Sequence, residues 1–250
     1  MSAKDPFADR TLRAVTQQQV ADDFDRLTES YERKINDAIA FGGYEHSFYI
    51  NVKRDRILKL AAEHFPNPEQ LEALDLGCGV GAYHPGLEGK FRRLHGIDVS
   101  HRSVDVARQK YPFVHYETFD GERLPYSAGA FDLIFMICVM HHVPPPQWQD
   151  LTSEIYRVLK PGGLALVFEH NPYNPATQYI VKSCEIDKDA VLLRPHTLRK
   201  LFRNAGFEAP ATRSILSVPP VGPLLTQIDE VLGHLSFGAQ YYLSASKPAQ

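Results

Sequence analysis

The chain has 250 residues, 44% of them hydrophobic, and a formal net charge of −3 at pH 7. This length suits one large α/β domain with a small appended cap. No basic run stands out, which argues against broad binding to nucleic acid or to anionic membranes.

The amino-terminal quarter is predicted to form a helical cap. The first ten residues are polar and lack the apolar core of a secretory signal. Over residues 11–65, apolar side chains recur at spacings of three and four, which is typical of amphipathic helices. Gly42-Gly43 interrupts the pattern, and a second helix is expected over about 46–65. We therefore assign residues 1–65 to a cap or lid over the substrate.

Strands and helices then alternate, which predicts an α/β fold with a doubly wound, mostly parallel sheet. Strands are expected at 72–77, 93–98, 114–118, 131–139 and 164–169, and helices at 83–88, 103–110 and 148–159. Near-continuous apolar stretches such as 133–139 are typical of strands buried on both faces. Residues 66–250 are expected to form this domain.

The regular alternation of strands and helices ends after Glu169. Residues 171–175 are predicted as a rigid turn, and a helix is expected over 195–204. Two later strands, 212–218 and 240–246, flank Pro219-Pro220 and an apolar helix at 224–235, and such a pair often forms an antiparallel edge. We expect two insertions, 171–193 and 219–237, near the functional pocket.

A glycine-rich loop, Gly77-Cys78-Gly79-Val80-Gly81, follows the first predicted strand. Glycines allow the backbone to approach a ligand where a Cβ would collide. Asp75 stands just before the loop, where a carboxylate would repel a pyrophosphate. It suits a cofactor with a cationic end, such as S-adenosylmethionine, and disfavours a nicotinamide dinucleotide.

Two further acids end later strands. Asp98 ends the strand 93–98, where a carboxylate can accept both hydroxyls of a ribose; the alternative is a helix cap. Asp120 follows the strand 114–118, where it can accept an adenine amine.

These motifs, with Leu124-Pro125-Tyr126, His141-His142-Val143 and Lys160-Pro161-Gly162-Gly163, resemble a class I S-adenosylmethionine-dependent methyltransferase of the small-molecule type. The resemblance covers roughly residues 72–170. It implies a Rossmann-like, seven-stranded sheet with an antiparallel last strand. It also implies S-adenosylmethionine as cofactor, held by Asp75, Gly77, Cys78, Gly79, Gly81, Asp98, Val99, Asp120, Gly121, Ile137 and Cys138.

Three histidines are candidates for a general base: His141, His142 and His170. Each follows a predicted strand, and each could instead serve in packing or capping. A metal site is not expected. Although these histidines could converge with Glu169, the region lacks the paired Asp or Asn ligands that suit Mg²⁺.

The acceptor pocket is expected to have aromatic and apolar walls with a few polar groups, which suits a small organic molecule. Its candidate residues are Tyr31, Tyr44, His46, Tyr49, Tyr173 and Arg194.

O-methylation is the favoured activity. C-methylation of a quinone-like or polyketide-like ring is the alternative, and a catalytically silent cofactor-binding regulator is a third. We expect a cytoplasmic protein with three free cysteines and no nucleic-acid or membrane partner. Its oligomeric state stays open, with a homodimer as one option.

Overall fold

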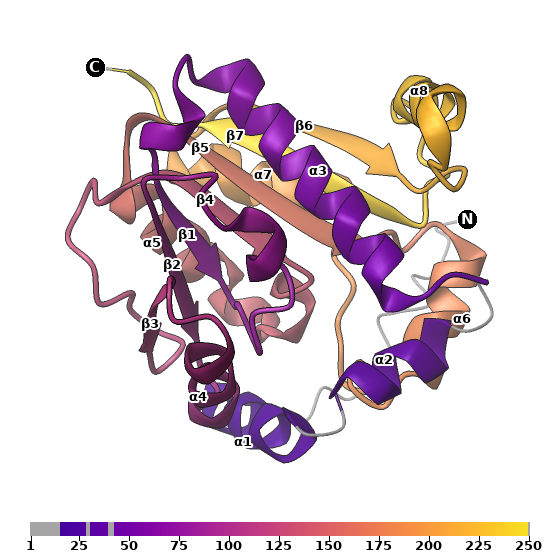
Figure 1. Ribbon diagram of the computed structural model, residues 1–250, viewed down its shortest axis with the longest axis horizontal. Coiled ribbons are helices and arrows are strands. Elements are labelled where there is room, and N and C mark those ends of the chain that lie inside the picture. Colours follow the sequence, from indigo (N-terminus) through magenta and orange to yellow (C-terminus); the bar gives the residue numbers. More distant parts are fainter. Residues whose placement is uncertain (1–15, 29–30, 40–42, 250) are drawn as a thin grey trace, which may run out of the picture.

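The computed structural model describes residues 16–28, 31–39 and 43–249, which build an α/β fold around one seven-stranded sheet (Figure 1). The helices are α1 Gln17–Leu27, α2 Tyr31–Ile39, α3 His46–His64, α4 His101–Lys110, α5 Trp148–Val158, α6 Pro175–Ser183, α7 Pro195–Ala205 and α8 Gly222–Leu232. The strands are β1 Glu72–Leu76, β2 Arg93–Asp98, β3 His115–Thr118, β4 Phe131–Ile137, β5 Leu159–His170, β6 Glu208–Ile215 and β7 Gln240–Ser246.

The sheet has the order β3-β2-β1-β4-β5-β7-β6. Neighbouring strands from β3 to β5 are parallel, whereas β7 runs antiparallel to both β5 and β6. The predicted fold class, including the antiparallel last strand, is therefore confirmed. Every residue of β1 is buried, as a central strand covered on both faces requires.

Helices cover both faces of the sheet (Figure 1). On one face Ile57 and Ala61 of α3 and Val104 of α4 are fully buried in one apolar cluster. On the other face Leu151 of α5 and Phe202 of α7 belong to a second cluster. The first two helices lie at the rim, with α1 against α4 and α2 between α3 and α6.

Three predicted boundaries were wrong for identifiable reasons. The helix expected over 83–88 is only a 3-10 turn, His84–Leu87, because Pro85 and Gly86 interrupt it. Strand β5 begins at Leu159, and a register irregularity opposite Phe131 and Leu133 accommodates its Pro-Gly-Gly segment. Helix α6 begins where a turn alone was expected. Asn174 caps it by accepting a hydrogen bond from the Thr177 backbone N–H, and proline occupies the first helical position.

The topology places a crevice between β1 and β4, where the chain order of the strands reverses. Ligands of open α/β sheets bind in such a crevice, beyond the carboxyl ends of the strands. Among the described residues, no helix combines the length and apolar character needed to span a membrane.

Candidate functional site

The glycine loop after β1 is held in a conformation that requires glycine. The N–H groups of Gly77 and Cys78 both donate to the Ile97 carbonyl, at 2.8 and 3.1 Å. Gly77 has a φ of 80°, and a Cβ there would collide with Val139. Gly79 also has a positive φ, but a Cβ built on it would meet no atom within 4 Å. This glycine therefore leaves open a space that a ligand can fill.

Asp98 connects this loop to the end of β2. One carboxylate oxygen accepts from the Gly79 N–H at 2.8 Å, and the other accepts from the Ser100 N–H at 2.9 Å. Burial raises the pKa of Asp98 above its ordinary value, although the backbone donors oppose the shift. Each carboxylate oxygen can accept more than one hydrogen bond, so capacity remains for ligand hydroxyls.

The crevice contains two cavities that meet at the glycine loop. The Asp98 lobe is a cavity of about 90 Å³ lined by Asp98, and the histidine lobe is a cavity of about 180 Å³ lined by His141, His142 and His170. Both lobes are lined by Gly77, Gly79, Val80, Ile137, Cys138 and His142. A ligand that filled both lobes would therefore pass over Gly79 and beside Cys138.

The Asp98 lobe has largely apolar walls suited to an adenine ring. Val99, Phe119 and Gly121 line it from the sheet side, and Phe24 of α1 lines the other side. Asp120 lies outside this lining and is exposed; its Oδ1 accepts from the N–H groups of Glu122 and Arg123. These backbone donors lower the pKa of Asp120.

Asp75 forms part of a buried chain of side chains below the loop. Its Oδ2 lies 3.0 Å from Nε2 of His84, whose Nδ1 lies 2.5 Å from the Tyr116 hydroxyl. Burial raises the pKa of Asp75, while His84 opposes the shift. Asp75 also lines the histidine lobe, so this carboxylate is both anchored and next to the ligand space. Gly81 packs against the same group, because a Cβ there would contact His84 and Tyr116.

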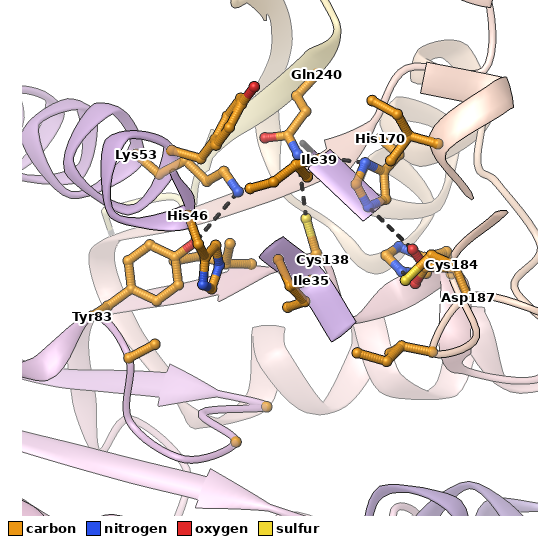
Figure 2. A pocket seen from close by; sticks show the side chains of 18 of the residues that line it. Ile35, Ile39, His46, Lys53, Tyr83, Cys138, His170, Cys184, Asp187 and Gln240 are labelled. Carbon is orange, nitrogen blue, oxygen red and sulfur yellow. Dashed lines mark hydrogen bonds and ion pairs between the residues drawn. The ribbon is translucent and has the colours of Figure 1, made fainter. Parts of the chain in front are cut away.

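In the histidine lobe, polar groups face one another across the cavity. Figure 2 shows Lys53, His46 and Tyr83 on one side and His170 and Asp187 on the other. Lys53 is only 4% exposed, and its ammonium donates to the Tyr83 hydroxyl at 3.3 Å.

Gln240 and Cys138 lie between these two sides (Figure 2). The Gln240 Nε2 lies 3.4 Å from His170 Nδ1 and 3.9 Å from the Cys138 sulfur. The Gln240 Oε1 is buried and has no hydrogen-bond partner among the described residues. It can accept a hydrogen bond from a ligand in the lobe.

The three predicted histidines do converge, around a carboxylate that we did not predict. His141 and His142 form the 3-10 turn after β4, and His170 ends β5. Asp187 Oδ1 lies 3.5 Å from His141 Nε2 and 3.4 Å from His142 Nε2, and its Oδ2 lies 4.0 Å from His170 Nε2. Glu169, at the end of β5, contacts both His141 and the backbone of the turn. Its Oε2 accepts from His141 Nδ1 at 2.6 Å, and its Oε1 accepts from the Met140 N–H at 2.8 Å.

Charge is distributed unevenly in this polar cluster. Burial alone lowers the pKa of His141, but attraction to Glu169 and Asp187 outweighs burial and raises the pKa well above its ordinary value. Burial, together with the neighbouring His141, lowers the pKa of His142. Burial alone raises the pKa of Asp187, but the imidazoles of His141 and His142 hold it well below its ordinary value. Burial alone raises the pKa of Glu169, but attraction to His141 lowers it below its ordinary value, so both carboxylates stay ionised at neutral pH.

The residues predicted to bind the acceptor do not all lie at the histidine lobe. His46 and Tyr49 line the histidine lobe, whereas Tyr44 stacks on Phe48 with ring centroids 4.3 Å apart. Tyr173 is 49% exposed, and Arg194 is the residue before α7. The side chain of Tyr31 lies outside the described part of the chain. Of the five candidates whose side chains are described, His46 and Tyr49 line the histidine lobe.

Lys53, Asp187 and Gln240 were missed from the sequence. Lys53 had a usable signal, because it precedes the buried Ile57 and Ala61 at spacings of four and therefore shares their helix face. Asp187 lies in a segment without periodicity, so no local pattern marked it.

Comparisons with known proteins agree with this fold. Residues 74–167 match the family model described as a methyltransferase domain. A malonyl-(acyl-carrier protein) O-methyltransferase of Serratia marcescens is 34% identical over 159 residues, which are 61% of this chain and 52% of that protein. A sterol 24-C-methyltransferase of Clavispora lusitaniae is 26% identical over 223 residues, or 79% of this chain and 58% of that protein. The chain thus spans about half the length of the curated relatives it matches.

Among solved structures, a SAM-dependent methyltransferase of Thermotoga maritima has the same fold, with a TM-score of 0.65 and 22% identity. That alignment covers 91% of this chain and 99% of the other.

Proposed function

We propose that the chain is a class I S-adenosylmethionine-dependent methyltransferase that transfers the methyl group to an oxygen of a small organic acceptor. The match of residues 74–167 to a methyltransferase domain supports this proposal. The observation that supports this proposal most is the meeting of the two lobes at Gly79 and Cys138, with a polar cluster on the far wall. A cofactor whose adenosine filled the Asp98 lobe would present its sulfonium to the histidine lobe.

The residues present fit S-adenosylmethionine in this position. Asp98 has acceptor capacity for the ribose hydroxyls, and Gly79 leaves the backbone approachable. Asp75 lies where it could attract the ammonium group. The ammonium of Lys53 and the unsatisfied oxygen of Gln240 could bind polar groups of the methionine part or of the acceptor.

In this reaction the S–CH₃ bond breaks as the O–CH₃ bond forms, and the sulfonium becomes the neutral sulfide of S-adenosylhomocysteine. Alignment of the oxygen with the methyl carbon, together with exclusion of water, supplies much of the acceleration. We assign His170 as the acceptor of the hydroxyl proton. The proton is taken up at Nδ1, the nitrogen that faces the Gln240 amide at 3.4 Å, while Nε2 carries its own proton on the Asp187 side; His141 is already engaged by Glu169.

C-methylation is the second candidate, and the lining of the histidine lobe favours it. Ile35 and Ile39 of α2, Ile180 of α6 and Leu216 give the lobe a mostly apolar wall. Such a wall suits a hydrophobic acceptor, and one relative named above is a C-methyltransferase.

The test is to supply the full chain with S-adenosylmethionine carrying a ¹³C-labelled methyl group and a panel of hydroxylated aromatic and aliphatic compounds. We expect S-adenosylhomocysteine to be released with at least one hydroxyl compound, and the methyl carbon to resonate in the O-methyl region. A product labelled on carbon would select the second candidate. Binding of the cofactor without turnover on any compound would select a silent regulator.

A further inference from the structure

Three potential metal ligands from separate segments converge on one wall of the histidine lobe. His141 and His142 come from the turn after β4, and Asp187 comes from the loop after α6. One ligand atom from each lies within 4.8 Å of the other two. We propose that His141, His142 and Asp187 bind a divalent transition-metal cation of the Zn²⁺ type.

The spacing of these atoms fits metal coordination better than hydrogen bonding. The two imidazole Nε2 atoms lie 3.5 and 3.4 Å from Asp187 Oδ1, whereas hydrogen bonds are usually about 2.7–3.2 Å long. Two metal–ligand bonds of about 2.1 Å at a tetrahedral angle place their ligand atoms about 3.4 Å apart. Both distances to Asp187 therefore match a tetrahedral site, and the third pair of ligand atoms lies within 4.8 Å.

His141 offers an independent sign of a missing ligand. The side chain is 1% exposed, and its Nε2 forms no hydrogen bond among the described residues, because the nearby Asp187 Oδ1, at 3.5 Å, is too far for a normal one. A buried nitrogen without a partner is costly unless something binds it. The nitrogen lies on the Asp187 side of the ring, where the proposed cation would sit.

The surroundings hold the ligands in place as metal sites require. The Nδ1 of His141 contacts Glu169 at 2.6 Å, and a carboxylate behind a ligating histidine holds the proton on Nδ1, so that Nε2 coordinates once a cation displaces its own proton. Asp187 is positioned by a turn in which its N–H donates to the Cys184 carbonyl. A few residues later, the Val191 N–H donates to the His141 carbonyl at 2.8 Å and ties this loop to the histidine turn.

The donor set indicates which cation would bind. Two imidazoles and one carboxylate suit Zn²⁺, Fe²⁺ or Ni²⁺, whereas Mg²⁺ and Ca²⁺ prefer oxygen ligands. Three protein ligands leave a coordination position open, and all three residues line the lobe. The expectation from sequence that no metal binds rested on a search for paired oxygen ligands of the Mg²⁺ type, and it did not include Asp187.

A role for this cation in binding the acceptor oxygen rests on the proposed function, but binding of the cation does not. With His141 and His142 as ligands, His170 would remain the imidazole available to accept a proton.

The proposal is tested by calorimetric titration of Zn²⁺ into the metal-free full chain, with Co²⁺ absorption spectra as a report of coordination geometry. We expect one equivalent of Zn²⁺ to bind, Mg²⁺ not to compete, and Co²⁺ to show visible bands of a four- or five-coordinate site. Asp187→Asn and His142→Gln should each weaken Zn²⁺ binding more than 100-fold, and Glu169→Gln by about 10–100-fold. Asp189→Asn is the matched control, because this exposed carboxylate stands two residues further along the same loop.

Equal Zn²⁺ affinity in Asp187→Asn and Asp189→Asn, or no stoichiometric binding by the unaltered chain, would overturn the proposal. Titration of S-adenosylhomocysteine into the same proteins separates this outcome from a failure of the proposed function. We expect the unaltered chain and Asp189→Asn to bind S-adenosylhomocysteine equally well, so that loss of Zn²⁺ binding alone would leave the proposed function standing.

Discussion

Individual side chains in this site combine structural and binding roles, and Asp98 shows this most clearly. It holds the N–H groups of Gly79 and Ser100, so the glycine loop depends on it even without a ligand. From the sequence, Asp98 was expected either to accept hydrogen bonds from the ribose hydroxyls or to cap a helix. The structure shows that it binds backbone N–H groups and also lines a cavity.

The first prediction concerns the two acids expected to hold adenosine. Asp98→Asn should weaken binding of S-adenosylhomocysteine roughly 10- to 100-fold, because a charge-assisted hydrogen bond contributes about 1.5–3 kcal/mol. Asp120→Asn should change the affinity little, since Asp120 is exposed and outside the lobe lining. Calorimetry on both variants checks this, and an equal loss in the two would restore Asp120 as the adenine partner.

The second prediction concerns the buried ammonium of Lys53. Its side chain is 4% exposed and its ammonium has the neutral Tyr83 hydroxyl as a hydrogen-bond partner, so desolvation of the charge opposes folding. Lys53→Met should therefore raise the free energy of unfolding by about 1–3 kcal/mol while it lowers turnover. Chemical denaturation and methyl-transfer assays test the two halves separately. A destabilised variant with full activity would show that Lys53 is a structural residue.

Helices and strands were predicted correctly where the local sequence pattern of apolar residues was strong. The central strands were found because buried strands such as Phe131–Ile137 are continuous apolar stretches. Helix α6 was missed because Asn174-Pro175 was interpreted as a turn, although asparagine before proline also begins helices. The position of Asp187 follows from α6 and the loop after it, and so it could not be placed without the tertiary structure.

Helix α3 gives the third prediction, through the histidine at its start. Burial, and then repulsion by Lys53, lower the pKa of His46 from 6.5 to about 4. The unfolded chain therefore binds more protons than the folded chain between these values, and stability present above pH 6.5 is lost as the pH falls toward 4. The loss can reach about 3 kcal/mol.

His46→Gln should remove this part of the acid sensitivity. Urea unfolding at pH 7 and pH 4.5 measures the difference, and His101→Gln on the exposed first position of α4 is the control. If His46→Gln and the unaltered chain lose equal stability on acidification, His46 is not held neutral by the fold.

In the whole molecule, the first two helices close both lobes. Phe24 of α1 borders the Asp98 lobe and meets the His142 ring edge-on, with centroids 5.0 Å apart, whereas Ile35 and Ile39 of α2 border the histidine lobe. The sequence indicated a helical cap over the substrate. We propose that the two helices cover cofactor and acceptor together, since each lines one of the lobes.

The fourth prediction follows from this arrangement. Removal of residues 1–43 should weaken binding of S-adenosylhomocysteine and abolish turnover, because both lobes lose a wall. The shortened chain should stay folded, since α3 buries Ile57 and Ala61 against the sheet. Circular dichroism checks folding and calorimetry checks binding. A shortened chain with unchanged affinity would mean that α1 does not contribute to the cofactor site.

A crystal structure of the full chain with S-adenosylhomocysteine tests the central claim most directly. We expect the ribose on Asp98, the adenine between Phe119 and Leu151, and the sulfur over Gly79 with its open side toward the histidine lobe. A ligand bound elsewhere, or a sulfur turned away from His170 and Asp187, would contradict the account.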